Sequence, residues 1–263
     1  MSALQDLIEI SKKVAQHPRL VQGGGGNCSV KSGGQRWVKA SGCFLEDISD
    51  KKGFAIVDAV SGAPIDESGG KASMETPLHT LLGSFVSHTH PVAVAALMSS
   101  IESKVWFAQL FLEPQFIWVP YATPGKKLFE KVKSIIKRDD SDKIIFLQNH
   151  GLFVSSESKQ RALDLHEQTA SCVENFFEKV KTRLEIPDGH YLTPDHVIYG
   201  QLKNDAASTK QKTAVNETLQ LVGEALAMIY QKGGTPHWLL NSEVALLLNM
   251  EEEKHRRQVW KNS

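Results

Sequence analysis

The feature that most constrains the fold of this chain is the alternation of short apolar runs with helix-like patterns over its first 180 residues. Several runs have the length and the β-branched or aromatic content of buried strands, namely 37–39, 54–57, 85–90, 116–119, 144–147 and 152–154. Helix-like segments lie between them, at 3–16, from Pro77, at 92–98 and after a predicted cap at Ser156. Such interleaving predicts a layered α/β domain.

A chain of 263 residues forms one large domain or two small ones, and either can bury a core without disulfides. We expect residues 1–184 to form the α/β catalytic domain and residues 185–263 to form a helical extension packed on it. The segment 185–209 has the composition of a loop-rich connector. Helical patterns follow at 210–231 and 242–260. The charged end of the last pattern, from Glu251, is expected to be a solvated face.

Charge and hydropathy exclude several kinds of partner. The 30 Lys and Arg residues balance 30 Asp and Glu residues, so the chain lacks the positive field that nonspecific binding to nucleic acid or anionic membranes requires. The longest apolar run, 92–98, is far shorter than the roughly 18 residues of a membrane helix. Three cysteines without a C-x-x-C motif, and an N-terminus without a basic and apolar leader, predict a cytoplasmic protein.

The pattern His88-Thr89-His90 lies at the end of a predicted strand. Residues i and i+2 of a strand point to the same face, about 6.6 Å apart, so these two imidazoles can reach one metal ion. Neutral imidazole suits zinc and other late first-row ions. The alternative for an isolated H-x-H pattern is a pair of hydrogen-bonded polar histidines at a strand end.

Two further residues strengthen the metal hypothesis. His150 ends another apolar run and is followed at once by Gly151, and strand ends beside glycine turns are common places for site residues. Three histidines leave zinc an open position, which is a catalytic arrangement. Glu75 precedes a predicted helix, where its carboxylate can face the same cleft. Its alternative role is a helix-start carboxylate that favours the local dipole.

The glycine-rich segment 23–29 is the second candidate site. It has neither the G-x-x-x-x-G-K-[ST] pattern of a nucleotide P-loop nor the G-x-G-x-x-G pattern of a dinucleotide fold. Its backbone N–H groups, with Asn27 and Ser29, can still hold a phosphate, and Ser41-Gly42 adds a small polar contact. A flexible connector accounts for the composition equally well.

Several of these segments resemble motifs of the class II aldolase/adducin family, which includes the zinc-dependent fuculose- and rhamnulose-phosphate aldolases. The matching segments occur in family order and with family-like spacing within residues 20–180, and they are 26–29, 40–42, 73–75, 88–91, 120–125 and 148–152. Segments 74–79 and 88–92 look especially like the aldolase half of bifunctional aldolase–dehydrogenase proteins, and we expect no dehydrogenase half in this chain.

The resemblance implies a three-layer α/β/α fold around a mixed, largely antiparallel sheet. It also implies a Zn²⁺ site, with another divalent transition metal as an option, whose ligands are His88, His90 and His150. Glu75 matches the acid/base carboxylate of the family. Tyr121 matches a tyrosine that supplies a proton to a neighbouring subunit's site, which implies self-association, in typical members as a homotetramer.

The activity that the resemblance implies is zinc-dependent retro-aldol cleavage of a ketose 1-phosphate to dihydroxyacetone phosphate and an aldehyde. The metal would act as a Lewis acid and Glu75 would move the proton. The positions that match the family's phosphate-binding residues are Asn27, Ser29, Ser41, Gly42 and Ser73.

Three departures from the family pattern limit this assignment. Met74 stands where the sugar-phosphate aldolases often have a second serine. The family's C-terminal tyrosine has no clear match, and the candidates are Tyr191, Tyr199 and Tyr230. The region beyond residue 185 is longer than a minimal aldolase needs.

The same scaffold hosts other functions. They are phosphopentose 4-epimerases, sugar-phosphate dehydratases, sugar-acid-phosphate decarboxylases and non-catalytic adducin-like interaction proteins. Glu75 favours an aldolase or dehydratase over an epimerase, because epimerases resembling this family tend to carry aspartate there. The complete histidine set argues against a purely structural protein. Aldolase, dehydratase and decarboxylase remain open at this point.

Overall fold

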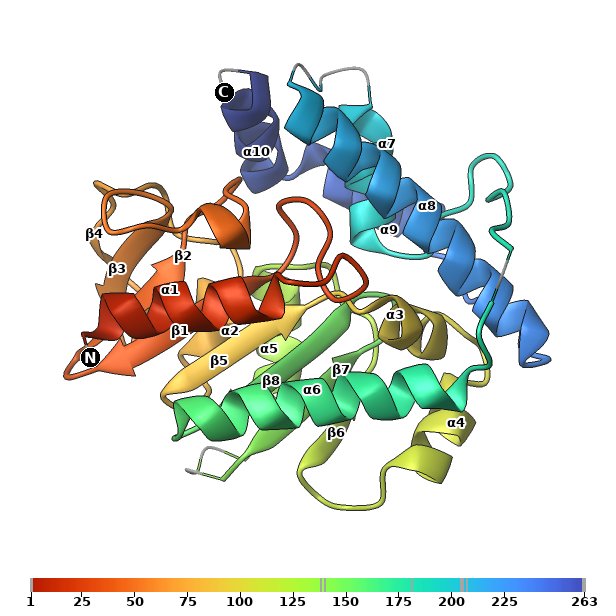
Figure 1. Ribbon diagram of the computed structural model, residues 1–263, viewed down its shortest axis with the longest axis horizontal. Helices are drawn as coiled ribbons and strands as arrows, with labels where there is room; N and C mark the ends of the chain where they lie inside the picture. Colours follow the sequence, from red (N-terminus) through yellow and green to blue (C-terminus); the bar gives the residue numbers. More distant parts are fainter. Residues whose placement is uncertain are drawn as a thin grey trace.

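The computed structural model describes residues 2–137, 139, 141–180, 182–203, 206 and 208–261. An eight-stranded sheet lies at its centre, in the order β4-β3-β2-β1-β5-β8-β7-β6 (Figure 1). The strands are β1 (Asn27–Ser32), β2 (Gln35–Lys39), β3 (Phe54–Asp58), β4 (Pro64–Asp66), β5 (Phe85–Thr89), β6 (Phe116–Val119), β7 (Lys143–Leu147) and β8 (Gly151–Ser156). Neighbouring strands are antiparallel except for β6 and β7, which are parallel, so the predicted mixed and largely antiparallel sheet is confirmed.

Helices cover both faces of this sheet. On one face lie α1 (Ala3–Val14) and α6 (Lys159–Phe176), which stand in front of the strands in Figure 1. On the other lie α2 (Thr76–His79) and α5 (Lys126–Lys133). Side chains of β7 alternate between the two cores: Ile144 and Phe146 pack in the core that includes α6, and Ile145 and Leu147 in the core of α2 and α5. The three-layer α/β/α architecture is therefore confirmed.

Six further helices are described beside those that cover the sheet. They are α3 (Val92–Met98), α4 (Ser103–Leu110), α7 (Pro194–Leu202), α8 (Thr209–Gln231), α9 (Asn241–Asn249) and α10 (Glu251–Lys261), with the short 3₁₀ turn η1 (Leu45–Asp47) after β2. Helices α7 to α10 group together above the loops of the sheet (Figure 1). Apolar residues of α8 share one buried cluster with α3, β7 and β8, so this C-terminal helix is continuous with the core.

Several sequence predictions need correction. The segment 185–209 contains a helix, α7, whose start was readable: Thr193 caps it and Pro194 occupies its first turn. The predicted helix 242–260 is two helices, with Met250 in extended backbone between them. Helix α6 is capped by Ser158 rather than Ser156, which belongs to β8.

Two strands lie where the sequence predicted no strand. β1 begins inside the glycine-rich segment, at Asn27, because it pairs on both sides with β2 and β5. The short strand β4 follows β3 and pairs with it. Among the described residues, no helix combines the length and the apolar composition that a membrane crossing requires.

Candidate active site

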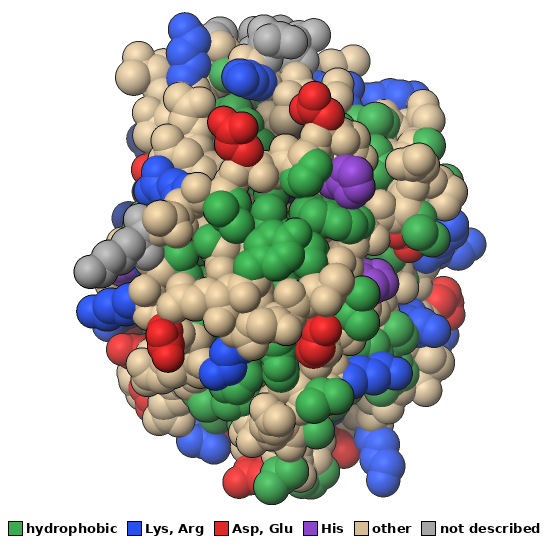
Figure 2. All heavy atoms as spheres, turned by 90° about the vertical axis from the view of Figure 1, so that its right-hand side faces the viewer, with side chains coloured by type: hydrophobic (Ala, Val, Ile, Leu, Met, Phe, Trp, Pro, Cys, Tyr) green, Lys and Arg blue, Asp and Glu red, His purple; other side chains and the backbone are tan. Residues whose placement is uncertain are grey.

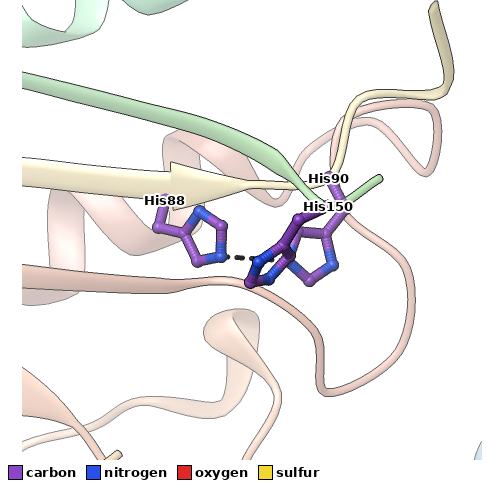
Figure 3. Close-up of side chains that lie close together, drawn as sticks. All are labelled: His88, His90 and His150. Carbon is purple, nitrogen blue, oxygen red and sulfur yellow. Dashed lines mark hydrogen bonds between the residues drawn. The ribbon is translucent and has the colours of Figure 1, made fainter. Parts of the chain in front are cut away.

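Three histidines at or beside the ends of adjacent strands converge at one point. His88 lies in β5, His90 follows the end of that strand, and His150 lies in the turn between β7 and β8. Because β5 pairs with β8, the turn that carries His150 lies beside the end of β5. One nitrogen of each ring lies within 4.8 Å of the others, and the three rings face one another (Figure 3). The structure therefore brings together all three predicted ligands.

The hydrogen bonds and burial of these rings suit metal binding. His88 donates a hydrogen bond from Nδ1 to the carbonyl oxygen of Leu152 at 3.0 Å, which leaves the lone pair of Nε2 facing the other rings. His90 contacts the carboxylate of Asp195 through Nδ1, and its Nε2 lies 3.0 Å from His88 Nε2. Burial lowers the pKa of His150 to about 3, so this imidazole is neutral at pH 7. Neutral imidazole is the form that binds zinc.

Glu75 lies against this histidine cluster. It immediately precedes α2, and its Oε2 is 3.3 Å from His88 Nε2 while its Oε1 is 3.5 Å from His150 Nε2. Burial disfavours the charged carboxylate, but positive charge at the histidine cluster outweighs burial and holds the pKa of Glu75 well below its usual range. The predicted carboxylate is thus ionised and next to the predicted ligands.

The residues fit a divalent cation. The Oε1 atom of Glu75 is buried and has no hydrogen-bond partner among the described residues. A buried carboxylate oxygen without a donor is costly unless a cation compensates it. Three imidazole nitrogens beside that oxygen form a donor set suited to zinc or a related transition ion.

A buried chain of hydrogen bonds holds Glu75 from behind. Arg36 donates to the hydroxyl of Ser29 at 2.8 Å, and that hydroxyl lies 2.7 Å from Nδ1 of His79. The Nε2 of His79 contacts Oδ1 of Asn27, whose amide donates to Glu75 Oε2 at 2.8 Å. Burial, with Arg36 nearby, holds the pKa of His79 well below its usual value, so this ring is neutral. A neutral ring accepts a hydrogen bond at Nδ1 and donates one from Nε2, so it continues the chain from Ser29 to Asn27. The sequence did not predict this role for His79.

The predicted phosphate-binding residues separate into two groups. Asn27, Ser41, Gly42 and Ser73 line a polar pocket that also contains Glu75, His90 and His150. Ser29 is fully buried and lies in the hydrogen-bond chain behind Glu75, and it is not among the residues that line this pocket. The fold therefore brings four of the five residues to the pocket.

The pocket contains three charged residues that were not predicted from the sequence, namely Lys39, Asp195 and Glu253. Lys39 is 3% exposed, and its ammonium donates to the carbonyl oxygen of Gly24 at 3.0 Å. A signal for it existed, because a lysine directly before Ala40-Ser41-Gly42 ends a strand whose other residues suit burial. Glu253 of α10 lines the same pocket and is 5% exposed, so the predicted solvated face is wrong for this residue.

Tyr121 is not brought to the pocket within the chain. It packs with apolar residues of α7 and α9, and burial raises the pKa of its phenol above the usual value. Among the tyrosines considered as the family's C-terminal one, Tyr199 is fully buried in α7, and its hydroxyl accepts a hydrogen bond from the N–H of Gly24 at 2.6 Å. Tyr230 is half-exposed on α8.

Comparison with known proteins agrees with this arrangement. A family model for the class II aldolase and adducin N-terminal domain matches residues 5–176. The chain belongs to the class II aldolase and adducin family. Class II aldolases are generally metal-dependent, and this class II aldolase homologue has the His88, His90 and His150 cluster in the matched region.

Solved structures share the fold of this class II aldolase homologue. The N-terminal class II aldolase domain of a conserved protein from Thermoplasma acidophilum has 26% sequence identity and a TM-score of 0.58, over 66% of this chain and 93% of that chain. An L-fuculose 1-phosphate aldolase has 21% identity and a TM-score of 0.52, over 71% of this chain and 91% of that chain. At that identity the likeness shows the fold alone.

A curated relative is much longer than this class II aldolase homologue. The Bacillus subtilis protein named uncharacterized oxidoreductase YuxG is 24% identical over 210 residues, which are 69% of this chain. This chain spans only 30% of the length of that relative.

Proposed function

We propose that this protein is a zinc-dependent lyase that cleaves a ketose 1-phosphate by a retro-aldol reaction to dihydroxyacetone phosphate and an aldehyde. The observation that carries the proposal is the meeting of three histidine nitrogens with the carboxylate of Glu75 at the wall of a polar pocket that contains Lys39. In this proposal residues 1–184 form the catalytic domain and residues 185–263 a helical extension. The same assignment makes the substrate a sugar phosphate and places the protein in carbohydrate metabolism.

His88, His90 and His150 would hold the cation. When bound, a divalent cation supplies Lewis acidity and stabilises the negative charge that develops on the donor half of the substrate. Glu75 is ionised and held by Asn27, so its free oxygen is available to accept and return a proton. Burial of the carboxylate excludes water from this transfer.

The same pocket also contains groups that can bind an anion. The ammonium of Lys39 and the hydroxyls of Ser41 and Ser73 line it, and a phosphate accepts hydrogen bonds from both kinds of group. Met74 lines the pocket where the resemblance expects a second serine, so the anion would have one hydroxyl fewer. We propose that Lys39 compensates with its charge.

Tyr121 stays our prediction for the proton donor to the aldehyde oxygen in a neighbouring subunit's site, which requires self-association, as a homotetramer. Light scattering should give the mass of a tetramer. Co-expression of Glu75→Gln and Tyr121→Phe chains should restore part of the activity that each lacks alone, because some mixed sites contain both native residues. A monomeric mass would contradict the role.

The three free cysteines support a reducing compartment, and we propose the cytoplasm.

The test begins with metal analysis of the purified protein, followed by an assay of ketose 1-phosphates with dihydroxyacetone phosphate as the readout. Glu75→Gln should keep zinc and lose turnover by about 100-fold or more, because general acid–base groups contribute that much. His90→Ala should lose zinc as well. Wild-type turnover in Glu75→Gln would contradict the assigned base. Bound zinc without cleavage of any ketose phosphate would favour a dehydratase or a decarboxylase, and a protein without metal would favour an adducin-like role.

A further inference from the structure

We propose that Asp195 is a positioning residue of the metal site: its carboxylate, at the start of α7, orients the imidazole of His90 for the cation. Asp195 lies outside residues 5–176, the part of the chain that the family model matches. The inference rests on the metal site of the proposed function.

The contact itself is well defined. Nδ1 of His90 donates to Oδ2 of Asp195, and the two side chains are 10% and 11% exposed. A proton on Nδ1 leaves the lone pair of the ring on Nε2, and this atom lies 3.0 Å from Nε2 of His88. The carboxylate therefore selects the tautomer and the ring orientation that a metal ligand needs.

The other two histidines differ from His90 in the hydrogen-bond partner of the Nδ1 atom. His88 donates to the backbone carbonyl of Leu152, which no side-chain substitution removes. His150 has a buried Nδ1 without a hydrogen-bond partner among the described residues. His90 is thus the ligand whose support comes from a side chain, and that side chain can be replaced.

The glycine-rich segment is shaped to receive this face of α7. Tyr199 lies one helical turn after Asp195, and its hydroxyl accepts from the N–H of Gly24 at 2.6 Å. A Cβ atom at Gly25 would lie 2.7 Å from Oδ2 of Asp195 and 3.0 Å from Nδ1 of His90. The absence of side chains in this segment lets α7 approach until its carboxylate reaches the histidine.

A structural role must be distinguished from a positioning role. Asp195 is also an acidic residue in the first turn of α7, where a carboxylate stabilises a helix without any effect on a metal. A positioning role predicts that loss of the carboxylate weakens metal binding while the stability of the metal-free protein stays the same. A purely structural role predicts no such separate loss of metal affinity.

The experiment compares zinc affinity of full-length variants by competition with a coloured chelator. Asp195→Asn keeps the shape of the side chain and removes its charge, and we expect zinc binding to weaken by about 10- to 100-fold, as for other outer-shell partners. The thermal midpoint of the metal-free variant should stay within about 3 °C of the wild type, the shift expected for roughly 1 kcal/mol. Spectra of the cobalt-loaded variant should show an altered ligand field.

Two controls make the outcome decisive. Asp188→Asn makes the same chemical change at an exposed position before α7 and should bind zinc like the wild type. Thr193→Ala removes the cap of α7 without touching the carboxylate. Wild-type zinc affinity in Asp195→Asn, or an equal loss in Thr193→Ala, would overturn the inference. A wild-type protein that takes up no metal would overturn the proposed function instead.

Discussion

Two buried side chains of opposite charge line the polar pocket. Lys39 and Glu253 line the same pocket with opposite charges, and both are almost completely buried. Lys39 belongs to the central sheet, whereas Glu253 comes from α10. An anionic group that enters the pocket is attracted by the first side chain and repelled by the second.

The two residues should therefore change anion affinity in opposite directions. Lys39→Met should raise the KM for a phosphorylated substrate by about 10- to 100-fold, the value of a hydrogen bond to a charged group. Glu253→Gln should lower the same KM by about fivefold, because about 1 kcal/mol of like-charge repulsion is removed. Steady-state kinetics and inhibition by inorganic phosphate measure both effects.

The matched control for the charge change is Lys71→Met, since Lys71 is exposed. It should leave KM at the wild-type value. Lys39→Met with unchanged KM would remove Lys39 from the anion site, and Glu253→Gln with a higher KM would show that the carboxylate assists binding.

Helix α7 and the glycine-rich segment form one packing unit. A Cβ atom at Gly23 would lie 2.4 Å from the hydroxyl oxygen of Tyr199, so the helix occupies the space that a side chain would need. The same helix carries Asp195 to His90. The segment was predicted from composition as either a phosphate cradle or a flexible connector, and its N–H at Gly24 is instead bonded to Tyr199.

A pair of glycine substitutions separates packing from backbone strain. Gly23 has φ of +52° and Gly33 has φ of +60°, so alanine at either position adopts an unfavourable left-handed backbone at a cost of about 1–2 kcal/mol. Nothing lies within 4 Å of a Cβ at Gly33. Gly23→Ala should therefore cost about 1–3 kcal/mol more than Gly33→Ala, because the added methyl group overpacks the α7 contact.

Chemical denaturation of the two metal-free variants measures this difference. Equal losses of unfolding free energy would show that α7 yields to the added methyl group and that its position is not tightly fixed.

Across the molecule, burial of neutral histidines links stability to pH. His166 and His196 are both buried, and burial lowers the pKa of each from 6.5 to about 4. Because the folded-state pKa lies below the unfolded value, the unfolded chain binds more protons as the pH falls below 6.5. The contribution of these two histidines to the free energy of unfolding is therefore fully present above pH 6.5, and it is lost as the pH falls from 6.5 to 4.

The metal-free protein should thus be acid-labile. At pH 5.5, one unit below the unfolded pKa, each of the two groups should cost about 1.4 kcal/mol relative to neutral pH. His196→Asn should reduce this pH dependence by the share of one group, and His190→Asn, at an exposed position, should not. Urea denaturation at pH 7.5 and pH 5.5 measures the change in unfolding free energy between the two pH values. If that change were the same in His196→Asn as in the wild type, His196 would not contribute to it.

The sequence by itself determined the α/β class and most of the strands, because hydrophobic periodicity is local and survives in a single chain. It also identified the three histidines and Glu75, since each lies at a strand end or helix start. Tertiary structure decided what surrounds them. Asp195 is separated from His90 by 105 positions, and no pattern within one window relates two residues so far apart. Only packing of α7 against side-chain-free backbone places that carboxylate behind the imidazole, because contact depends on shape and distance rather than on spacing along the chain.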